Sequence, residues 1–302
     1  MQRQRTLRST VETSGIGLHS GESVHLKLCP APAGHGVVFR RTDLEPVIDI
    51  PARVDHVGDT RLSTTLQAGS ERVATVEHLL AALSGMGVDN VRVELSAPEV
   101  PILDGSARPF VSLIQAAGLQ DQPYARQYLR ILRKVEVADG DKEVSFLPFD
   151  GFKMSFTIDF DQPVLRRHAA HAEMDFSRDN FIDQVSSART FGFLDELESL
   201  RSRGFARGGS LDNAILLDRH RIVNREGLRS PDEFVKHKLL DAMGDLYLLG
   251  FSLRGEFRAH KSGHALNNAG LQALLNQPDA WEIVEDEPAV HVAPLWQRVP
   301  GV

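Results

Sequence analysis

Hydrophobic and polar positions follow a helical period along residues 232–250. At about 100° per residue, the polar side chains of His237, Lys238, Asp241 and Asp245 fall within one arc of about 100°. The opposite arc is apolar and contains Val235, Leu239, Leu240, Met243, Leu246 and Tyr247. Residues four apart on a helix point the same way, so His237 and Asp241 can bind one metal ion together. The pattern predicts a helix with one buried face and a candidate metal site on the other; a surface helix with merely solvated polar groups is the alternative.

One order of strands and helices occurs twice along the chain. In the first half, alternation predicts strands at 23–28 and 36–40, then a helix at 75–87, a strand at 91–95, a turn at 104–106 and a helix at 109–117. In the second half, the same signals predict strands at 129–137, 143–147 and 152–160, then a helix at 234–250, a strand at 255–259, a turn at 262–264 and a helix at 268–275. We therefore expect an α+β fold of two duplicated domains, each a β-sheet layer packed with two helices, with the helices sandwiched between the sheets.

The periodic pattern is interrupted near residues 121–127, where we place the boundary between the repeats. The first domain is expected at 1–125 with an insert at about 43–70. The second is expected at 126–280 with an insert at about 193–225, and residues 281–302 form a C-terminal tail.

Composition restricts the class of protein. The chain has 302 residues, 42% of them hydrophobic, and a formal net charge of −7, so a general nucleic-acid binder, which needs a basic face, is disfavoured. Cys29 is the sole cysteine, and the chain starts without an apolar signal-peptide region. No apolar run approaches the ~18 residues of a transmembrane helix. We expect a cytoplasmic protein without stable membrane insertion, and a monomer.

The duplication supplies a third metal ligand. His78 lies in the predicted helix at 75–87, which corresponds to the helix that carries His237. If the halves pack through a pseudo-twofold axis, His78, His237 and Asp241 converge and leave one position open for water, as in catalytic zinc sites. Zinc lowers the pKa of such a water toward ~7, and Glu77, beside a ligand, can take its proton.

A second cluster lies in Lys261-Ser-Gly-His264. Gly263 permits a turn, so His264 can project into a cleft, and a neighbouring carboxylate such as Asp245 would favour its charged form. His264 can then be an acid that protonates a leaving amine. The residues leave two alternatives open, a solvated loop histidine and a fourth zinc ligand that would make the site structural.

The chain resembles the zinc-dependent UDP-3-O-acyl-N-acetylglucosamine deacetylases of lipid A synthesis over most of its length. The motifs that carry the resemblance, in the family's order, are GIGLHSG (15–21), ATVEH (74–78), PILDGSARPF (101–110), SSARTFGF (186–193), FVKHKLLDAMGDL (234–246) and KSGHALNN (261–268). Members of the family often have Cys-Thr-Cys where this chain has Ser63-Thr64-Thr65, so inhibition by excess zinc through a thiolate there should be weaker.

The resemblance implies roles for the site residues. His78, His237 and Asp241 would bind zinc, with Glu77 as general base, His264 as general acid and Asp245 orienting its imidazole. Thr190 would help to stabilise the oxyanion, and Lys238 would contact the reacting region. Substrate contacts are implied at His19 and Phe191 along the sugar and nucleotide path, at Leu18, and at Lys142 and Asn267 near the diphosphate-nucleoside end.

The resemblance also assigns the second insert to a channel for a fatty-acyl chain. Apolar and small residues suited to a narrow channel are Leu194, Leu197, Ala206, Gly209, Ser210, Ala214 and Leu216. Without the resemblance, the same residues would indicate an ordinary strand–helix–strand core.

The function implied is hydrolysis of the N-acetyl amide of UDP-3-O-acyl-N-acetylglucosamine, with Zn²⁺ as cofactor and Fe²⁺ equally suited to two His and one Asp. Two rival hypotheses remain: a zinc deacetylase for another amide, and a non-catalytic sugar-nucleotide binding protein with a structural metal and four protein ligands.

Overall fold

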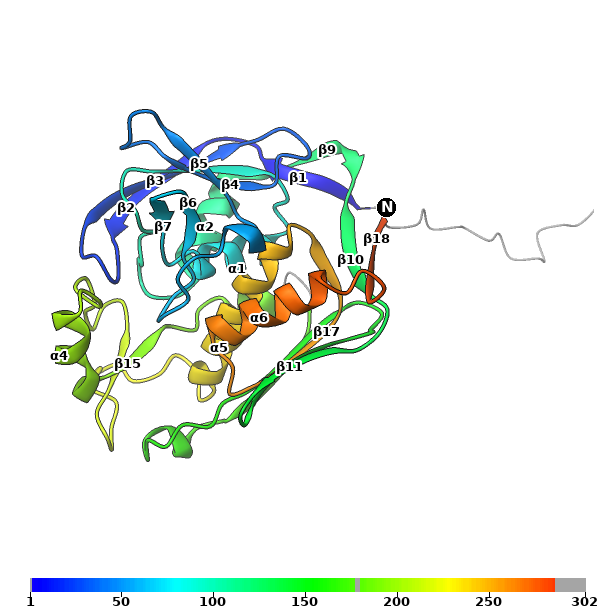
Figure 1. The fold of residues 1–302 in the computed structure, drawn as a ribbon. Coiled ribbons are helices and arrows are strands. Elements are labelled where there is room, and N and C mark those ends of the chain that lie inside the picture. The colour runs from blue at the N-terminus through cyan, green and yellow to red at the C-terminus, as the bar shows by residue number, and fades with distance from the viewer. Residues whose placement is uncertain (1, 177–179, 286–302) are drawn as a thin grey trace, which may run out of the picture.

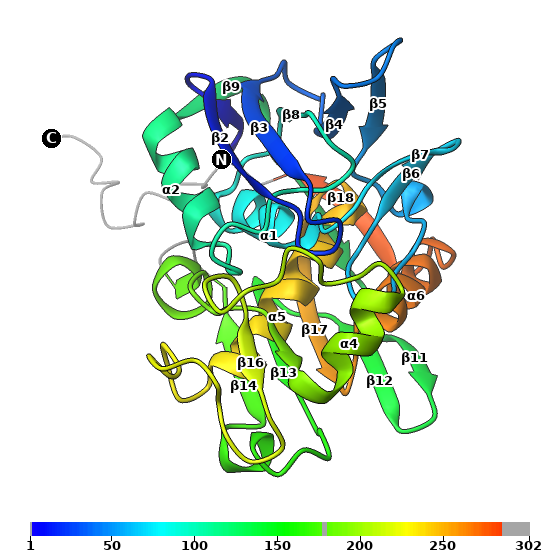
Figure 2. The same ribbon diagram turned by 90° about the vertical axis from the view of Figure 1, so that its left-hand side faces the viewer.

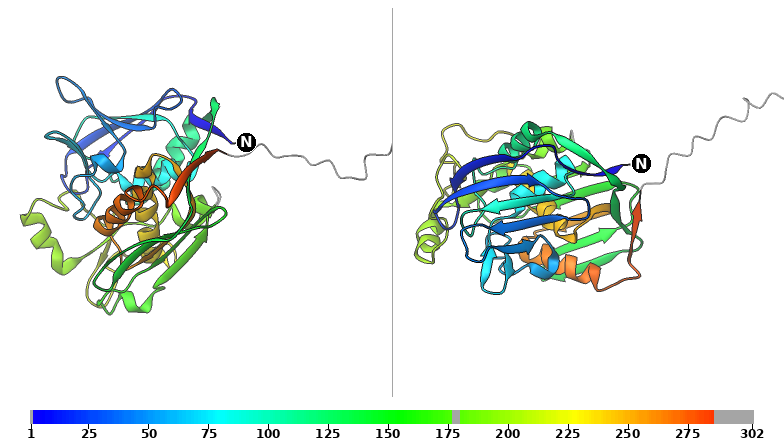
Figure 3. Two further views of the ribbon diagram at one scale, coloured as in Figure 1. Left: turned by 45° about the vertical axis from the view of Figure 1, so that its right-hand side comes forward. Right: turned by 90° about the horizontal axis from the view of Figure 1, so that it is seen from above.

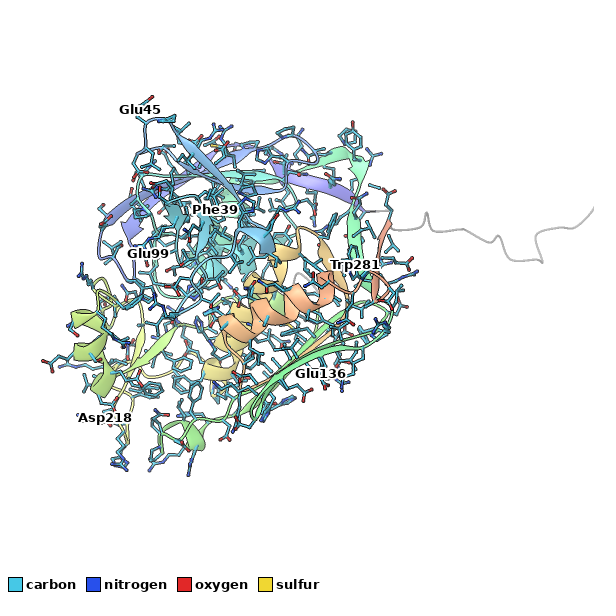
Figure 4. All side chains as sticks on the ribbon, viewed as in Figure 1. Phe39, Glu45, Glu99, Glu136, Asp218 and Trp281 are labelled. Carbon is cyan, nitrogen blue, oxygen red and sulfur yellow. The ribbon has the colours of Figure 1, made fainter. Side chains whose placement is uncertain are left out.

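The computed structural model describes residues 2–176 and 180–285. Its fold is α+β, as the sequence predicts, with helices lying between two main sheets (Figures 1 and 3). Buried apolar side chains of both sheets and of the helices form one continuous core, in which Phe39 of the first sheet is fully buried (Figure 4).

The first sheet has the strand order β2-β3-β8-β4-β5. These strands are β2 (Val11–Ile16), β3 (Ser23–Pro30), β4 (Val37–Arg41), β5 (Ile48–Pro51) and β8 (Val91–Leu95). Side chains alternate between buried and partly exposed along β4 and β8, because one face of the sheet packs on the helices. Only the β4–β8 pair is parallel; the other neighbouring strands are antiparallel.

Five strands of the second sheet, β11-β12-β17-β13-β14, follow the same order of antiparallel and parallel neighbours, with β13–β17 as the parallel pair among them. Its strands are β11 (Val135–Asp139), β12 (Lys142–Leu147), β13 (Phe152–Thr157), β14 (His171–Asp175) and β17 (Ser252–His260). Two more strands extend the sheet: β10 (Gln127–Ile131) forms a second parallel pair with the start of β17, and β18 (Trp281–Glu285) pairs antiparallel with β10. A duplicated unit would give this arrangement, although the predicted domain limits stay predictions.

Four helices separate the sheets: α1 (Glu77–Met86), α2 (Arg108–Ala117), α5 (Glu233–Leu246) and α6 (His264–Leu275). The central contact is between α1 and α5, one from each half (Figure 1). They meet at Gly244, where a Cβ would come 2.0 Å from the backbone oxygen of Glu77. The missing side chain therefore allows the two backbones to touch at the first turn of α1.

The insert predicted at 193–225 lies at the edge of the molecule (Figure 1), and its helix faces the viewer in Figure 2. It comprises α4 (Leu194–Ser202) and β16 (Ile215–Leu217), which pairs in parallel with β15 (Phe191–Phe193). No residue of α4 is buried, so this helix does not form the core that the strand–helix–strand interpretation required. Smaller elements are β1 (Arg3–Leu7), β6 (Leu66–Ala68), β7 (Glu71–Val73), β9 (Leu119–Ala125), η1 (Val54–His56), η2 (Leu165–Arg167), η3 (Phe181–Val185) and η4 (Tyr247–Leu249).

Several boundaries differ from the prediction. The boundary expected near residues 121–127 falls largely within β9, which pairs antiparallel with β1. The helix expected at 268–275 begins at His264, because extended Gly263 ends the preceding turn there. The strand expected at 129–137 is divided between β10 and β11. Of the expected tail, residues 281–285 form β18, and residues 286–302 lie outside the described part. Within the described ranges, no helix is long and apolar enough to cross a membrane.

The contact at Gly244 predicts the effect of adding one methyl group. We expect Gly244→Ala to lower the free energy of unfolding by about 2 kcal/mol or more, because overpacking costs ~1–3 kcal/mol and here the obstacle is backbone. Gly192→Ala is the control, since its added Cβ meets no heavy atom within 4 Å. Denaturant unfolding of both variants measures the difference. Equal stability of the two variants would contradict this account of the helix contact.

Candidate functional site

The metal-binding side chains expected from the sequence lie together where α1 meets α5. One ligand atom from each of His78, His237 and Asp241 lies within 4.8 Å of the others, and all three residues are buried. The Oδ1 atom of Asp241 is 3.4 Å from Nε2 of His78 and 3.3 Å from Nε2 of His237. Within the described residues this Oδ1 is buried and has no hydrogen-bond partner. An orphaned carboxylate oxygen facing two imidazole nitrogens fits a divalent metal ion.

Burial and hydrogen bonds prepare these ligands. Burial lowers the pKa of His237 to about 3, so its ring is neutral. Its Nδ1 lies 3.0 Å from the Ala188 carbonyl oxygen, which selects the tautomer that leaves Nε2 free for a metal. Burial opposes ionisation of Asp241, but His237 and Lys238 hold its pKa well below the usual value. Lys238 donates to the other carboxylate oxygen, Oδ2, at 2.6 Å. His237 and Asp241 thus have the charge states that metal ligation requires.

Glu77 is the first residue of α1 and lies beside this cluster. Its Oε2 accepts a hydrogen bond from the backbone N–H of Thr64 at 3.1 Å, and its Oε1 is 3.8 Å from Nε2 of His264. Burial raises the pKa of Glu77 above its ordinary value. A buried carboxylate with a raised pKa, near but outside the ligand cluster, is suited to accept a proton.

His264 forms a pair with Asp245 on the other side of Glu77. Its Nδ1 is 2.9 Å from Oδ2 of Asp245, so its Nε2 remains available to the cavity. Burial opposes the charged imidazole, but the carboxylates of Asp245 and Glu77 outweigh it and raise the pKa of His264 to about 9. His264 is not part of the ligand cluster found among the described residues. The geometry therefore favours a proton donor over a fourth metal ligand.

The wall of a cavity of about 870 Å³ includes Glu77, His78, His237, Asp241 and His264, whereas Asp245 is paired with His264 outside that wall. Thr190, Lys238 and most of the expected substrate-binding residues also line it, namely Leu18, His19, Lys142, Phe191, Leu197, Ala206, Gly209, Ser210, Ala214 and Leu216. Phe191 packs edge-on against Phe234 and His237, at ring-centroid distances of 5.1 and 6.2 Å. The cavity thus extends from the candidate metal ligands to the insert that carries α4.

Two expected substrate-binding residues lie elsewhere. Leu194 is 47% exposed and is not part of the cavity wall. Asn267 is buried behind His264, where it donates to Oδ2 of Asp245 at 2.8 Å and accepts a hydrogen bond from Ser262. Its side chain therefore supports Asp245.

Some residues of the site escaped the sequence analysis. Phe160, Thr60 and Leu62 line the cavity, and Thr64 contacts both Glu77 and Asp245. Glu99 is buried, and its side chain accepts hydrogen bonds from the backbone N–H groups of His19 and Ser20 and from the Thr75 hydroxyl (Figure 4). It joins the GIGLHSG loop to the turn before α1, where Thr75 has a φ of +57°. Such a φ is a strained conformation for a β-branched residue.

Comparison with known proteins agrees with the resemblance in the motifs. Residues 4–276 match the family model for LpxC, UDP-3-O-acyl N-acetylglycosamine deacetylase. The UDP-3-O-acyl-N-acetylglucosamine deacetylase of Saccharophagus degradans is 57% identical over 300 residues, covering 98% of this chain and 99% of its own. Those of Teredinibacter turnerae and Pseudomonas entomophila are 56% and 59% identical, with at least 95% of each chain covered. This chain therefore belongs to the LpxC family of UDP-3-O-acyl-N-acetylglucosamine deacetylases.

Proposed function

We propose that this protein hydrolyses the N-acetyl amide of UDP-3-O-acyl-N-acetylglucosamine and releases acetate, an early step of lipid A synthesis. The observation that carries the proposal is that one cavity wall brings together three candidate metal-ligand atoms, a separate buried carboxylate and the imidazole of His264, which is paired with the carboxylate of Asp245. The names of the curated relatives supply the substrate.

His78, His237 and Asp241 would hold the metal ion, Zn²⁺ or Fe²⁺. When bound, the ion supplies Lewis-acid chemistry: it acidifies water and polarises a carbonyl oxygen. Glu77 takes the proton from the attacking water, for which its position beside His78 and its raised pKa are suited. The water oxygen then adds to the amide carbon.

The other residues handle charge and the leaving group. The Thr190 hydroxyl and the Lys238 ammonium, both in the cavity wall, stabilise the negative oxygen that forms on the former carbonyl. His264 gives its Nε2 proton to the nitrogen as the C–N bond breaks, and Asp245 stabilises the imidazolium beforehand. Acetate and the free amine result.

The cavity accommodates the rest of the substrate. Lys142 and His19 suit the diphosphate-nucleoside and sugar, because a placed lysine can hold phosphate in a protein of net charge −7. The wall formed by Leu197, Ala214 and Leu216 suits the acyl chain. We infer that Asn267 acts through Asp245, since its amide is buried against that carboxylate.

The rival hypothesis, a non-catalytic sugar-nucleotide binding protein, requires a structural metal ion held by four protein ligands. The cluster of described residues contains three, and Nδ1 of His264 is bonded to Asp245. The rival deacetylase for another amide differs in its use of the acyl chain, and the third prediction below separates the two.

Removing ligands and removing the base should have different effects. We expect His237→Ala and Asp241→Asn to lose both bound metal and acetate release. Glu77→Gln should keep its bound metal, and its turnover should fall about 10²–10⁴-fold, because only the proton acceptor is gone. Elemental analysis and acetate release on the same samples measure both quantities. Metal loss in Glu77→Gln would instead make Glu77 a ligand.

The pH profile should depend on Asp245. Turnover needs Glu77 ionised and His264 protonated. As the pH rises, turnover should therefore increase through the pKa of Glu77 and decrease through the pKa of His264. The pKa of His264 is raised to about 9 by its neighbours, and a bound metal cation would lower it from there. Asp245→Asn removes a charge that raises the His264 pKa, so the basic limb should move to lower pH. Asp195→Asn, on the exposed helix α4, is the control. An unchanged basic limb in Asp245→Asn would reject His264 as the acid.

The acyl channel predicts a substrate-selective defect. Ala214→Phe should raise KM at least about tenfold for a 3-O-acylated substrate, because the ring occupies space meant for the chain. Its effect on UDP-N-acetylglucosamine without the 3-O-acyl group should be small. Ser202→Phe, on the exposed face of α4, serves as control. Equal effects on both substrates would place the acyl chain elsewhere.

A further inference from the structure

Thr64 lies in the insert of the first half, to which the proposed mechanism gives no task. It is buried, with 1% of its surface exposed, between Ser63 and Thr65, which are also buried. It comes from the loop that precedes β6, yet it reaches groups of α1, α5 and α6.

The backbone of Thr64 holds the start of α1. Its N–H donates to Oε2 of Glu77 at 3.1 Å, and its carbonyl oxygen accepts from the N–H of Val76 at 3.3 Å. One peptide segment therefore fixes both the Glu77 carboxylate and the backbone that carries it. Because the Thr64 N–H holds Oε2 of Glu77, the other carboxylate oxygen, Oε1, faces Nε2 of His264.

The side chain of Thr64 acts on the other half of the molecule. Its hydroxyl donates to Oδ1 of Asp245 at 2.6 Å and lies 3.2 Å from Nδ1 of His264. The second carboxylate oxygen of Asp245, Oδ2, accepts a hydrogen bond from the Asn267 amide and pairs with Nδ1 of His264. Among the side chains that the structure describes, Thr64 is the sole donor to Oδ1. Loss of this donor would leave the buried Oδ1 of Asp245 without a hydrogen bond, and the carboxylate could then rotate away from the imidazole of His264.

We propose that Thr64 is a positioning residue that sets the proton acceptor Glu77 and the proton donor pair His264–Asp245 in register across the two halves. The proposal rests on the proposed function and adds a residue to it. The hydroxyl acts through Asp245 on His264, while the backbone acts on Glu77. A side-chain substitution therefore isolates the first of these effects.

The test compares isosteric and conservative variants. Thr64→Val keeps shape and the backbone bonds but removes the hydroxyl; we expect kcat to fall about tenfold or more, with KM and bound metal unchanged. Thr64→Ser should restore most of kcat. Thr65→Val is the matched control, because in the described structure the neighbouring Thr65 hydroxyl bonds to none of Glu77, Asp245 and His264.

A double-mutant cycle separates positioning from a general structural role. In a His264→Ala background, Thr64→Val should change kcat less than twofold, because the group on which it acts is gone. The same loss of kcat in both backgrounds, or no loss in Thr64→Val alone, would overturn the proposal. Absence of acetate release by the metal-loaded wild type would instead reject the proposed function, so the two failures are distinguishable.

Discussion

The close approach of α1 and α5 is the constraint on which the site depends. Gly244 presents no side chain where the Glu77 backbone passes, so His78 at the start of one helix meets His237 and Asp241 on the other. Neither half carries all three ligands. The same contact buries the three residues. Burial lowers the pKa of His237 and keeps its ring neutral, while His237 and Lys238 hold the pKa of Asp241 low and keep its carboxylate ionised. The packing of the two helices therefore also assembles the proposed metal site.

Glu77 and Asp245, the two carboxylates proposed to act in proton transfer, have different surroundings. Glu77 is buried and receives one backbone donor, so its pKa is raised and it can accept a proton. The carboxylate of Asp245 instead accepts hydrogen bonds from Thr64 and Asn267 and pairs with His264, whose pKa it raises. Two carboxylates near one cavity can thus take different roles because their surroundings differ.

The sequence predicted what local periodicity encodes. The helical stripe placed His237 and Asp241 together, and the repeated order of elements supplied His78 as their partner. A contact between distant segments that the repeat does not mark could not be predicted: Thr64 and Asp245 are separated by 181 positions, and no local pattern marks a hydroxyl for such a contact. The start of α6 at His264 was missed because the turn signal of Ser262-Gly263 overlaps the helix start. Asn267 was placed at the nucleotide by resemblance, whereas only packing shows its amide against Asp245.

The central claim is that one metal ion, shared by the two halves, is required for amide hydrolysis. It is tested most directly by measuring bound metal and acetate release on one purified sample while a chelator removes the metal and Zn²⁺ is then restored. The account predicts one ion per chain at full activity, parallel loss of metal and acetate release, and recovery of both on restoration. Acetate release that persists in metal-free protein would contradict it.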